Sequence, residues 1–220
     1  MLEIVSGLPV RSNWGIASRL HTSTTMTERF ADHPIDPLFL ARWSPRAYDG
    51  RPMPEADLMR ILEAARWAPS AYNYQPWRFV YARRDDVHWA EFVSLLAPLN
   101  GDWAKHASAL IFVLSDTRFH HDDPANTSPS HTHSFDAGAA WAQLALQAVS
   151  LGYHARGMAG VDYDRARTVL QVPERFRIEI AVAVGHRGDA ATLPSPLQPH
   201  EGPTPRRPIS ESAFSGRFPA

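Results

Sequence analysis

Two stretches of the chain place their apolar side chains at helical spacing. In residues 54–67 one helical face carries Leu58, Ile61, Leu62 and Ala65. Pro54 suits the first turn of this predicted helix, and Pro69 ends it because proline does not continue a helix. Residues 135–151 are rich in alanine and nearly free of charge. This pattern predicts a second helix that is buried on most sides, in a core or against a partner subunit.

Shorter runs predict the remaining elements. Strands are predicted over residues 77–81, 109–114 and 176–184, where apolar residues run continuously or alternate with smaller or polar ones. Further helices are predicted over residues 37–43, 85–96 and 162–170. A long loop is predicted over residues 116–134, which are rich in His, Pro, Ser and Asp. Residues 192–208 contain six prolines and predict an extended arm without a core of its own.

The order of these elements favours an α+β fold. The chain has no glycine-rich turn between a strand and a helix, which a doubly wound nucleotide-binding fold requires. We therefore expect a single domain over residues 31–220, with the extended arm occupying about 192–220. Residues 1–30 show neither helical nor strand periodicity and are predicted to form a disordered extension. Met26, within that extension, is a candidate translation start.

The composition mainly excludes classes of function. The 220 residues have a formal net charge of -1, which gives nucleic-acid binding no support. No apolar run reaches the roughly 20 residues that span a bilayer. Residues 1–10 hold an acidic Glu3 and no basic cluster, so we expect a cytoplasmic protein without a secretory signal. Cysteine is absent, so any redox chemistry must come from a bound cofactor rather than from thiols or iron–sulfur clusters.

The first cluster with candidate chemistry combines cations and a hydroxyl near a helix end. Its members are Arg42, Trp43, Ser44 and Arg46. A guanidinium group binds two phosphate oxygens at once, and a serine hydroxyl adds a neutral hydrogen bond. Two arginines near a helix end are more often a solvated face, so this cluster alone leaves both interpretations open.

The second cluster lies between the helix over 54–67 and the strand that begins at Trp77. Its small and amide side chains are those of Ser70, Ala71, Asn73 and Gln75. Small side chains let the backbone approach a flat polar heterocycle, and amide groups can hydrogen-bond to it. A proline-punctuated loop with packed aromatic rings explains the same residues without any ligand.

In this order, the two clusters resemble the signature of the nitroreductase family of flavoproteins. The matching pattern is Arg-x-Ser-x-Arg-x-Tyr from Arg42, then a helix, then Ala-Pro-Ser-x-x-Asn-x-Gln-Pro-Trp ending at Trp77. Four later segments resemble that family's central dimer helix, its glycine-containing turn over the flavin, its last core strand and its C-terminal basic motif: 136–152, 151–160, 180–185 and 205–209. The resemblance covers about residues 34–211.

The resemblance implies an architecture and a cofactor. The fold would be α+β, with a mixed, mainly antiparallel sheet flanked by helices in an intertwined homodimer. FMN would lie at the subunit interface. The candidate cofactor-binding residues are Arg42, Trp43, Ser44, Arg46, Pro69, Ser70, Ala71, Asn73, Gln75, Asn100, Gly157, Met158, Ala159, Gly160, Arg206 and Arg207.

Some of these residues would bind the phosphate end of FMN, and one would face the ring. Arg42 and Ser44 would hold the phosphate and the ribityl chain, with Arg206, Arg207 or both returning to the phosphate. Arg46 would lie near the pyrimidine edge of the ring. A fixed cation there stabilises the negative charge that reduced flavin gains near N1 and O2.

The other residues would surround the ring. Four would reach FMN from the other subunit: Pro69, Ser70, Ala71 and Asn73. Asn100 would contact the ring, and Met158, Ala159 and Gly160 would present backbone groups to flavin N5. Glycines at 157 and 160 allow that close approach.

Two positions depart from the family pattern. Ala159 stands where several relatives have an acidic residue, and Trp103 stands at about the place where others have a lysine. These departures leave open the substrate and the choice between NADH and NADPH.

For activity, the resemblance implies a ping-pong cycle. NADH or NADPH would give hydride to flavin N5, and a nitroaromatic, quinone or similar small acceptor would then take it. Reductive dehalogenation, enone reduction and free-flavin reduction are alternatives on the same fold. A non-catalytic flavin-binding protein and a domain without flavin are the alternatives from other classes.

Histidines crowd the predicted loop over residues 116–134. The sequence there includes His120-His121-Asp122-Asp123 and His131-Thr132-His133. Imidazole and carboxylate groups ligate zinc or nickel, but this spacing matches no closed structural site, so no metal is predicted. We interpret the segment as a solvated loop, or as part of the substrate entrance.

Overall fold

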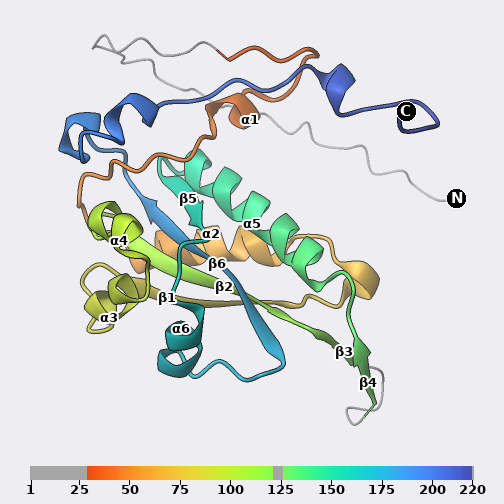
Figure 1. Cartoon of the computed structure of the whole chain (residues 1–220), viewed down its shortest axis with the longest axis horizontal. Helices are drawn as coiled ribbons and strands as arrows, with labels where there is room; N and C mark the ends of the chain where they lie inside the picture. The colour runs from red at the N-terminus through yellow and green to blue at the C-terminus, as the bar shows by residue number, and fades with distance from the viewer. Residues whose placement is uncertain (1–28, 121–125, 220) are drawn as a thin grey trace, which may run out of the picture.

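The computed structural model describes residues 29–120 and 126–219. At its centre is a four-stranded sheet in the order β1-β2-β6-β5. Its strands are β1 Trp77–Arg83, β2 Ala109–Asp116, β5 His154–Met158 and β6 Phe176–Gly185. Every neighbouring pair in this sheet is antiparallel, and helices flank it (Figure 1). The predicted α+β class is therefore confirmed, while the dimer stays a prediction.

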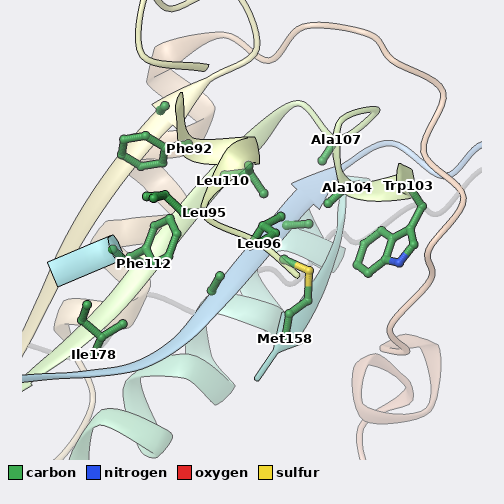
Figure 2. Close-up of a cluster of buried hydrophobic side chains, with 14 of the residues drawn as sticks. Phe92, Leu95, Leu96, Trp103, Ala104, Ala107, Leu110, Phe112, Met158 and Ile178 are labelled. Carbon is green, nitrogen blue, oxygen red and sulfur yellow. The ribbon is translucent and has the colours of Figure 1, made fainter. Parts of the chain in front are cut away.

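Strand β2 is the element on which both helical layers rest. All eight of its residues are buried, because apolar side chains fill both faces of the strand. On one face Ile111 and Val113 pack into the cluster that holds the apolar sides of α2 and α5. On the other face Leu110 and Phe112 join the cluster drawn in Figure 2.

Helices α2 and α5 cover one face of the sheet, whereas α3, α4 and α6 contribute to the cluster on the other face. The helices are α1 Pro37–Ala41, α2 Glu55–Arg66, α3 Trp89–Ser94, α4 Pro98–Ala104, α5 His133–Ser150 and α6 Tyr163–Val169. The predicted helices over residues 54–67 and 135–151 are confirmed as α2 and α5. The three predicted strands are confirmed as β1, β2 and β6, each somewhat longer than expected.

The predicted helix over residues 85–96 is wrong in extent. Asp86 forms a turn, because its N–H donates to the Arg83 carbonyl and its carboxylate accepts from the His88 N–H at 3.1 Å. Such local hydrogen bonds compete with a helix, so α3 begins only at Trp89.

Helix α4 has no counterpart in the sequence prediction. Asn100 and Gly101 weaken its helical pattern, which hides it in the sequence. Pro98 starts it in a position that proline favours, and the burial of Trp103 and Ala104 holds it against the sheet.

Half of the segment 151–160, which was expected to be a turn, is a strand, whereas residues 151–152 do form a turn. β5 pairs with β6 from His154 opposite Gly185 to Met158 opposite Ala181. Gly157 suits this place because a Cβ there would lie 3.1 Å from Ile180 Cδ1. Strand pairing thus overrides the local preference of the glycine-containing sequence for a turn.

The predicted loop over residues 116–134 contains a short hairpin. Strands β3 Arg118–His120 and β4 Thr127–Pro129 pair antiparallel. The Arg118 guanidinium donates to Thr127 Oγ1 at 2.9 Å, which ties the two strands together. The loop prediction is wrong for these strands. Part of the histidine cluster, residues 121–125, lies outside the described residues.

The C-terminal arm is extended, with short 3-10 turns, and it packs back onto the domain. Leu193 is buried, and the Ile209 N–H donates to Asp32 Oδ2 at 2.6 Å. Figure 1 shows the arm beside the residues that precede α1. The arm therefore contacts the first described residues, so the two ends of the described chain lie together. The predicted extension over residues 1–30, with Met26, lies almost wholly outside the described residues.

Leu144 of α5 tests the packing of this helix on the sheet. Its side chain is fully buried, with 0% exposure, so Leu144→Ala leaves a cavity. We expect the free energy of unfolding to fall by about 2–5 kcal/mol, measured by urea denaturation at one protein concentration. Leu99→Ala is the matched control, because Leu99 is 58% exposed and its truncation should change stability by less than about 0.5 kcal/mol. Equal losses would contradict the packing described.

Candidate functional site

A cavity of about 400 Å³ on the described chain is lined by an unusual number of cations. Five arginines face it, and we call this set the arginine cradle: Arg29, Arg42, Arg46, Arg156 and Arg206. The remaining lining residues are Trp43, Ser44, His200, Gly202 and Thr204. So many guanidinium groups around one cavity provide a donor set for a multiply charged anion.

Segments far apart in the sequence build this cradle. Arg42 follows the C-terminus of α1, a helix whose N-terminal cap is the Asp36 carboxylate. Arg156 extends from the edge strand β5, and Arg206 comes from the C-terminal arm. Arg29 is held by two backbone carbonyls, those of Leu40 and Arg42, each at 2.7 Å. The fold, rather than a single motif, therefore concentrates the charge.

The arginines form two groups, one at each end of the cradle, and the members of a group affect each other's pKa. Burial lowers the pKa of Arg42, and the neighbouring charges of Arg29 and Arg206 lower it further. Burial likewise lowers the pKa of Arg156, but here the nearby cation is Arg46. Arg29, Arg42 and Arg206 form one end of the cradle. Arg46 and Arg156 form the other.

A buried carboxylate organises the second end. Glu201 Oε1 accepts the backbone N–H groups of Arg46 at 2.7 Å and Ala47 at 2.9 Å. Its Oε2 lies 3.8 Å from the Arg46 guanidinium, and the side chain is only 3% exposed. Within the described chain this Oε2 is buried without a hydrogen-bond partner. Glu201 thus holds Arg46 by charge and fixes the arm to the segment after α1.

The donor set fits a ligand that carries a phosphate. Three guanidinium groups and the hydroxyl of Ser44 surround the first end, and such groups bind phosphate oxygens. The second end offers two more guanidinium groups, of which that of Arg156 lies next to the buried ring of Trp103, and this donor pair suits the polar edge of a flat heterocycle. FMN carries a phosphate and a planar polar ring at opposite ends of a ribityl chain.

The sequence identified only part of the cradle. It predicted Arg42, Trp43, Ser44, Arg46 and Arg206, and the structure brings these together. It missed Arg29, Arg156 and Glu201. Two signals were available in the sequence. Arg156 lies at alternating spacing with His154 and Met158, and Glu201 is the single carboxylate of residues 192–208.

Arg207 is not brought to the cradle. Its side chain is 86% exposed and lies 3.9 Å from Glu211 Oε2. The sequence left open whether Arg206, Arg207 or both return to the phosphate. The structure places Arg206 at the cavity and Arg207 outside it.

The predicted ring-contacting segment lies together at the end of β5. The Gly160 carbonyl accepts the Ala97 N–H at 2.9 Å and the Asn100 Nδ2 at 3.2 Å. A Cβ at position 160 would collide with Asn100 Nδ2, so a larger residue there would displace the Asn100 amide from this turn. Met158 packs into the core, whereas Ala159 is exposed. Asn100 thus fixes the turn at Gly160 and holds it next to α4.

A second cavity, of about 430 Å³, adjoins this segment. Gly157, Met158 and Ala159 form one wall, and Trp141 of α5 and Glu179 of β6 contribute to the others. These predicted residues therefore line a cavity distinct from the arginine cradle, with β5 as the element common to both.

The predicted loop over residues 69–75 does not line the cradle, and its backbone is strained. Tyr72, Asn73 and Gln75 have φ values of 52°, 55° and 55°, which side-chain-bearing residues rarely adopt. Ser70 Oγ accepts the Gln75 N–H at 2.9 Å, and the Ala71 N–H donates to Asp136 of α5 at 3.3 Å. The loop is thus held in a costly conformation with Tyr72 91% exposed. Its contact with FMN of another subunit stays a prediction.

A histidine beside the cradle has a displaced pKa. The rings of His154 and Trp43 lie 5.9 Å apart, and His154 Nδ1 is buried without a hydrogen-bond partner in the described chain. Burial, with the charges of Arg187 and His186, lowers the pKa of His154 to about 4. Near neutral pH this imidazole is therefore neutral, and it adds no further positive charge to the cradle.

No group of three or more potential metal-ligating side chains comes together in the described part of the chain. His133, from the histidine-rich segment, instead lies 2.8 Å from Ser115 Oγ and 3.5 Å from Glu179. His121, Asp122 and Asp123 lie outside the described residues.

Comparisons with known proteins find similar chains among nitroreductases and FMN-containing oxidoreductases. The model of the nitroreductase family matches residues 40–97 and 84–186. An oxidoreductase containing FMN is 51% identical, with a TM-score of 0.85, and the match covers 90% of this chain and 99% of that one. A nitroreductase-type protein of Desulfovibrio desulfuricans, solved in complex with FMN, is 27% identical, with a TM-score of 0.63 and coverage of 84% and 100%. A 15.4 kDa protein of Mycolicibacterium smegmatis is 34% identical over 149 residues, 64% of this chain and 97% of that protein.

The pKa of His154 predicts a pH dependence of stability. Because the folded-state pKa of about 4 lies below the usual value of about 6.5, the unfolded chain binds the proton first as the pH falls. Stability is therefore lost between about pH 6.5 and pH 4, by at most about 3 kcal/mol. His154→Gln removes this loss, so the stability difference between wild type and variant should shrink from pH 7 to pH 4.5 in urea titrations.

His88→Gln is the control for this pH dependence. The His88 side chain is 62% exposed, and the variant should follow the wild-type pH profile. A constant stability difference between wild type and His154→Gln across the same pH range would refute the role given to His154.

Proposed function

This chain belongs to the nitroreductase family, and on that premise we propose that it is an FMN-dependent oxidoreductase that passes hydride from NADH or NADPH to a small oxidised acceptor. Nitroaromatics and quinones are the acceptor classes we propose first. The observation that carries the proposal is the arginine cradle, whose two ends match the phosphate and the ring of FMN. Its support is the likeness to solved relatives that contain FMN.

The residues of the cradle bind and orient the cofactor. FMN, when bound, supplies the chemistry of accepting and donating hydride at N5. Arg29, Arg42 and Arg206 neutralise the phosphate, and Ser44 adds a hydrogen bond toward the ribityl chain. Arg46, held by Glu201, supplies positive charge toward the pyrimidine edge.

The segment at the end of β5 orients the reacting edge of the ring. Asn100 and the Ala97 N–H both bind the Gly160 carbonyl, which fixes the backbone around Ala159 and Gly160. A fixed backbone positions its N–H groups toward N5 without a reorganisation cost during reaction. In this proposal no side chain acts as a nucleophile, and water supplies protons.

We propose that the working form is a homodimer with FMN at the subunit interface. The strained loop of residues 69–75, with Tyr72 exposed, supports this because strain of this kind persists where the surrounding structure fixes a functional conformation. No helix in the described part of the chain is long and apolar enough to cross a membrane. A cytoplasmic location and the absence of nucleic-acid partners stay predictions.

The visible spectrum of the purified protein tests this function. We expect flavin absorption bands that bleach when NADH or NADPH is added without oxygen and that return when a nitroaromatic or quinone is added. Bands that do not bleach with either nicotinamide would favour a non-catalytic flavin-binding protein. A colourless protein that fails to take up added FMN would refute the proposal. A panel of halogenated, enone and free-flavin acceptors then separates the alternative activities of the same fold.

A further inference from the structure

Arg156 is a cation that the proposed function leaves without a role. It lies on the edge strand β5 and lines the arginine cradle, although the sequence does not mark it as a site residue. Its guanidinium carbon lies 5.7 Å from the centre of the Trp103 ring, and it donates a hydrogen bond to the Ser44 carbonyl. Trp103 is 2% exposed and belongs to the core cluster of Figure 2. A rigid part of the fold therefore holds Arg156 at the cavity.

The position of Arg156 in the cradle is defined by its neighbours. The Trp103 ring next to the Arg156 guanidinium stacks on the Tyr48 ring, with 6.3 Å between the ring centres. Tyr48 directly follows Arg46 and Ala47, whose N–H groups Glu201 holds. The charges that influence Arg42 are those of Arg29 and Arg206. Arg156 therefore belongs with Arg46 at the end of the cradle away from the three arginines that suit a phosphate.

The charges of the cradle do not balance with phosphate alone. Five guanidinium groups line the cavity, and Glu201 is the carboxylate that forms an ion pair with one of them in the described chain. A phosphate monoester brings a charge of about -1.5 to -2 near neutral pH. About two positive charges then remain, and one of them lies at the end with Arg46 and Arg156, where Glu201 offsets one of the two guanidinium groups. A second negative charge at that end would be stabilised.

We infer that Arg156, supported by Trp103, is a second cation at the pyrimidine edge of the flavin and, with Arg46, makes the reduced form of the cofactor bind more tightly than the oxidised form. This inference rests on the proposed function. Reduced flavin carries extra negative charge near N1 and O2, whereas the phosphate is the same in both redox states. A cation at the ring end therefore discriminates between the two states, and a cation at the phosphate end does not.

The reduction potential of bound FMN tests this inference. We expect Arg156→Gln to lose at least tenfold in its preference for reduced over oxidised FMN, which lowers the midpoint potential by about 30 mV for two electrons. Arg156→Lys keeps the charge and should retain most of the wild-type potential. Arg206→Gln is the matched control at the phosphate end. It should weaken the binding of both redox states equally and leave the potential unchanged.

The inference can also be tested on the wild-type protein, so the test does not depend on whether a variant folds. The midpoint potential of bound FMN should lie above that of free FMN in the same buffer, because the cradle favours the reduced form. A potential below that of free FMN would overturn the inference. So would an Arg156→Gln protein that binds FMN and keeps the wild-type potential, or an Arg206→Gln protein whose potential falls as far as that of Arg156→Gln.

The failure of the proposed function has a different signature. If the wild-type protein takes up no FMN, the proposed function fails, and the inference fails with it. If wild type takes up FMN but the potential does not respond to Arg156, the inference alone fails and the cofactor assignment stands.

Discussion

Repulsion between guanidinium groups is the constraint on which the site depends. Five arginines face one cavity of the described chain, with Glu201 as the buried carboxylate that forms an ion pair there. Two unit charges about 6 Å apart repel by about 3 kcal/mol at an effective dielectric of about 20. Such a cluster persists only when the surrounding structure holds each cation in place or an anion completes the set. Backbone carbonyls hold Arg29 and Arg156, Glu201 pairs with Arg46, and a phosphate-bearing ligand would offset the charge at the end with Arg29, Arg42 and Arg206.

The fold explains how this charge is kept in place. The sheet carries Arg156 on its edge strand, and the buried Trp103 connects that guanidinium to the core through its ring. Glu201 fastens the C-terminal arm to the backbone of Arg46 and Ala47, so the arm delivers Arg206 to the same cavity. Stability and cofactor binding are therefore coupled through a few contacts between the arm, β5 and the segment after α1.

The sequence predicted the elements whose apolar residues recur at a clear helical or strand spacing. It missed the elements that form because of tertiary contacts. The helix over 54–67 and the apolar strand at 109–114 needed only local patterns. β5 looked like a turn because Gly157, with Gly152 and Gly160 on either side of the strand, is a local turn signal, whereas the pairing of β5 with β6 is not visible in the sequence. The same error hid Arg156, whose side chain reaches the cradle only because residue 156 lies in a strand. Glu201 was missed because its partners, Arg46 and Ala47, are 154 or more residues away.

The claim that an anion completes the arginine cradle is tested most directly by titrating the cofactor-free protein with FMN and with riboflavin in a calorimeter. Riboflavin has the same ring and ribityl chain but no phosphate, so it leaves Arg29, Arg42 and Arg206 uncompensated. We expect FMN to bind at least about a hundredfold more tightly than riboflavin, since several charge-assisted hydrogen bonds are lost together. Equal affinities for the two ligands would contradict the role of the cradle as the phosphate site.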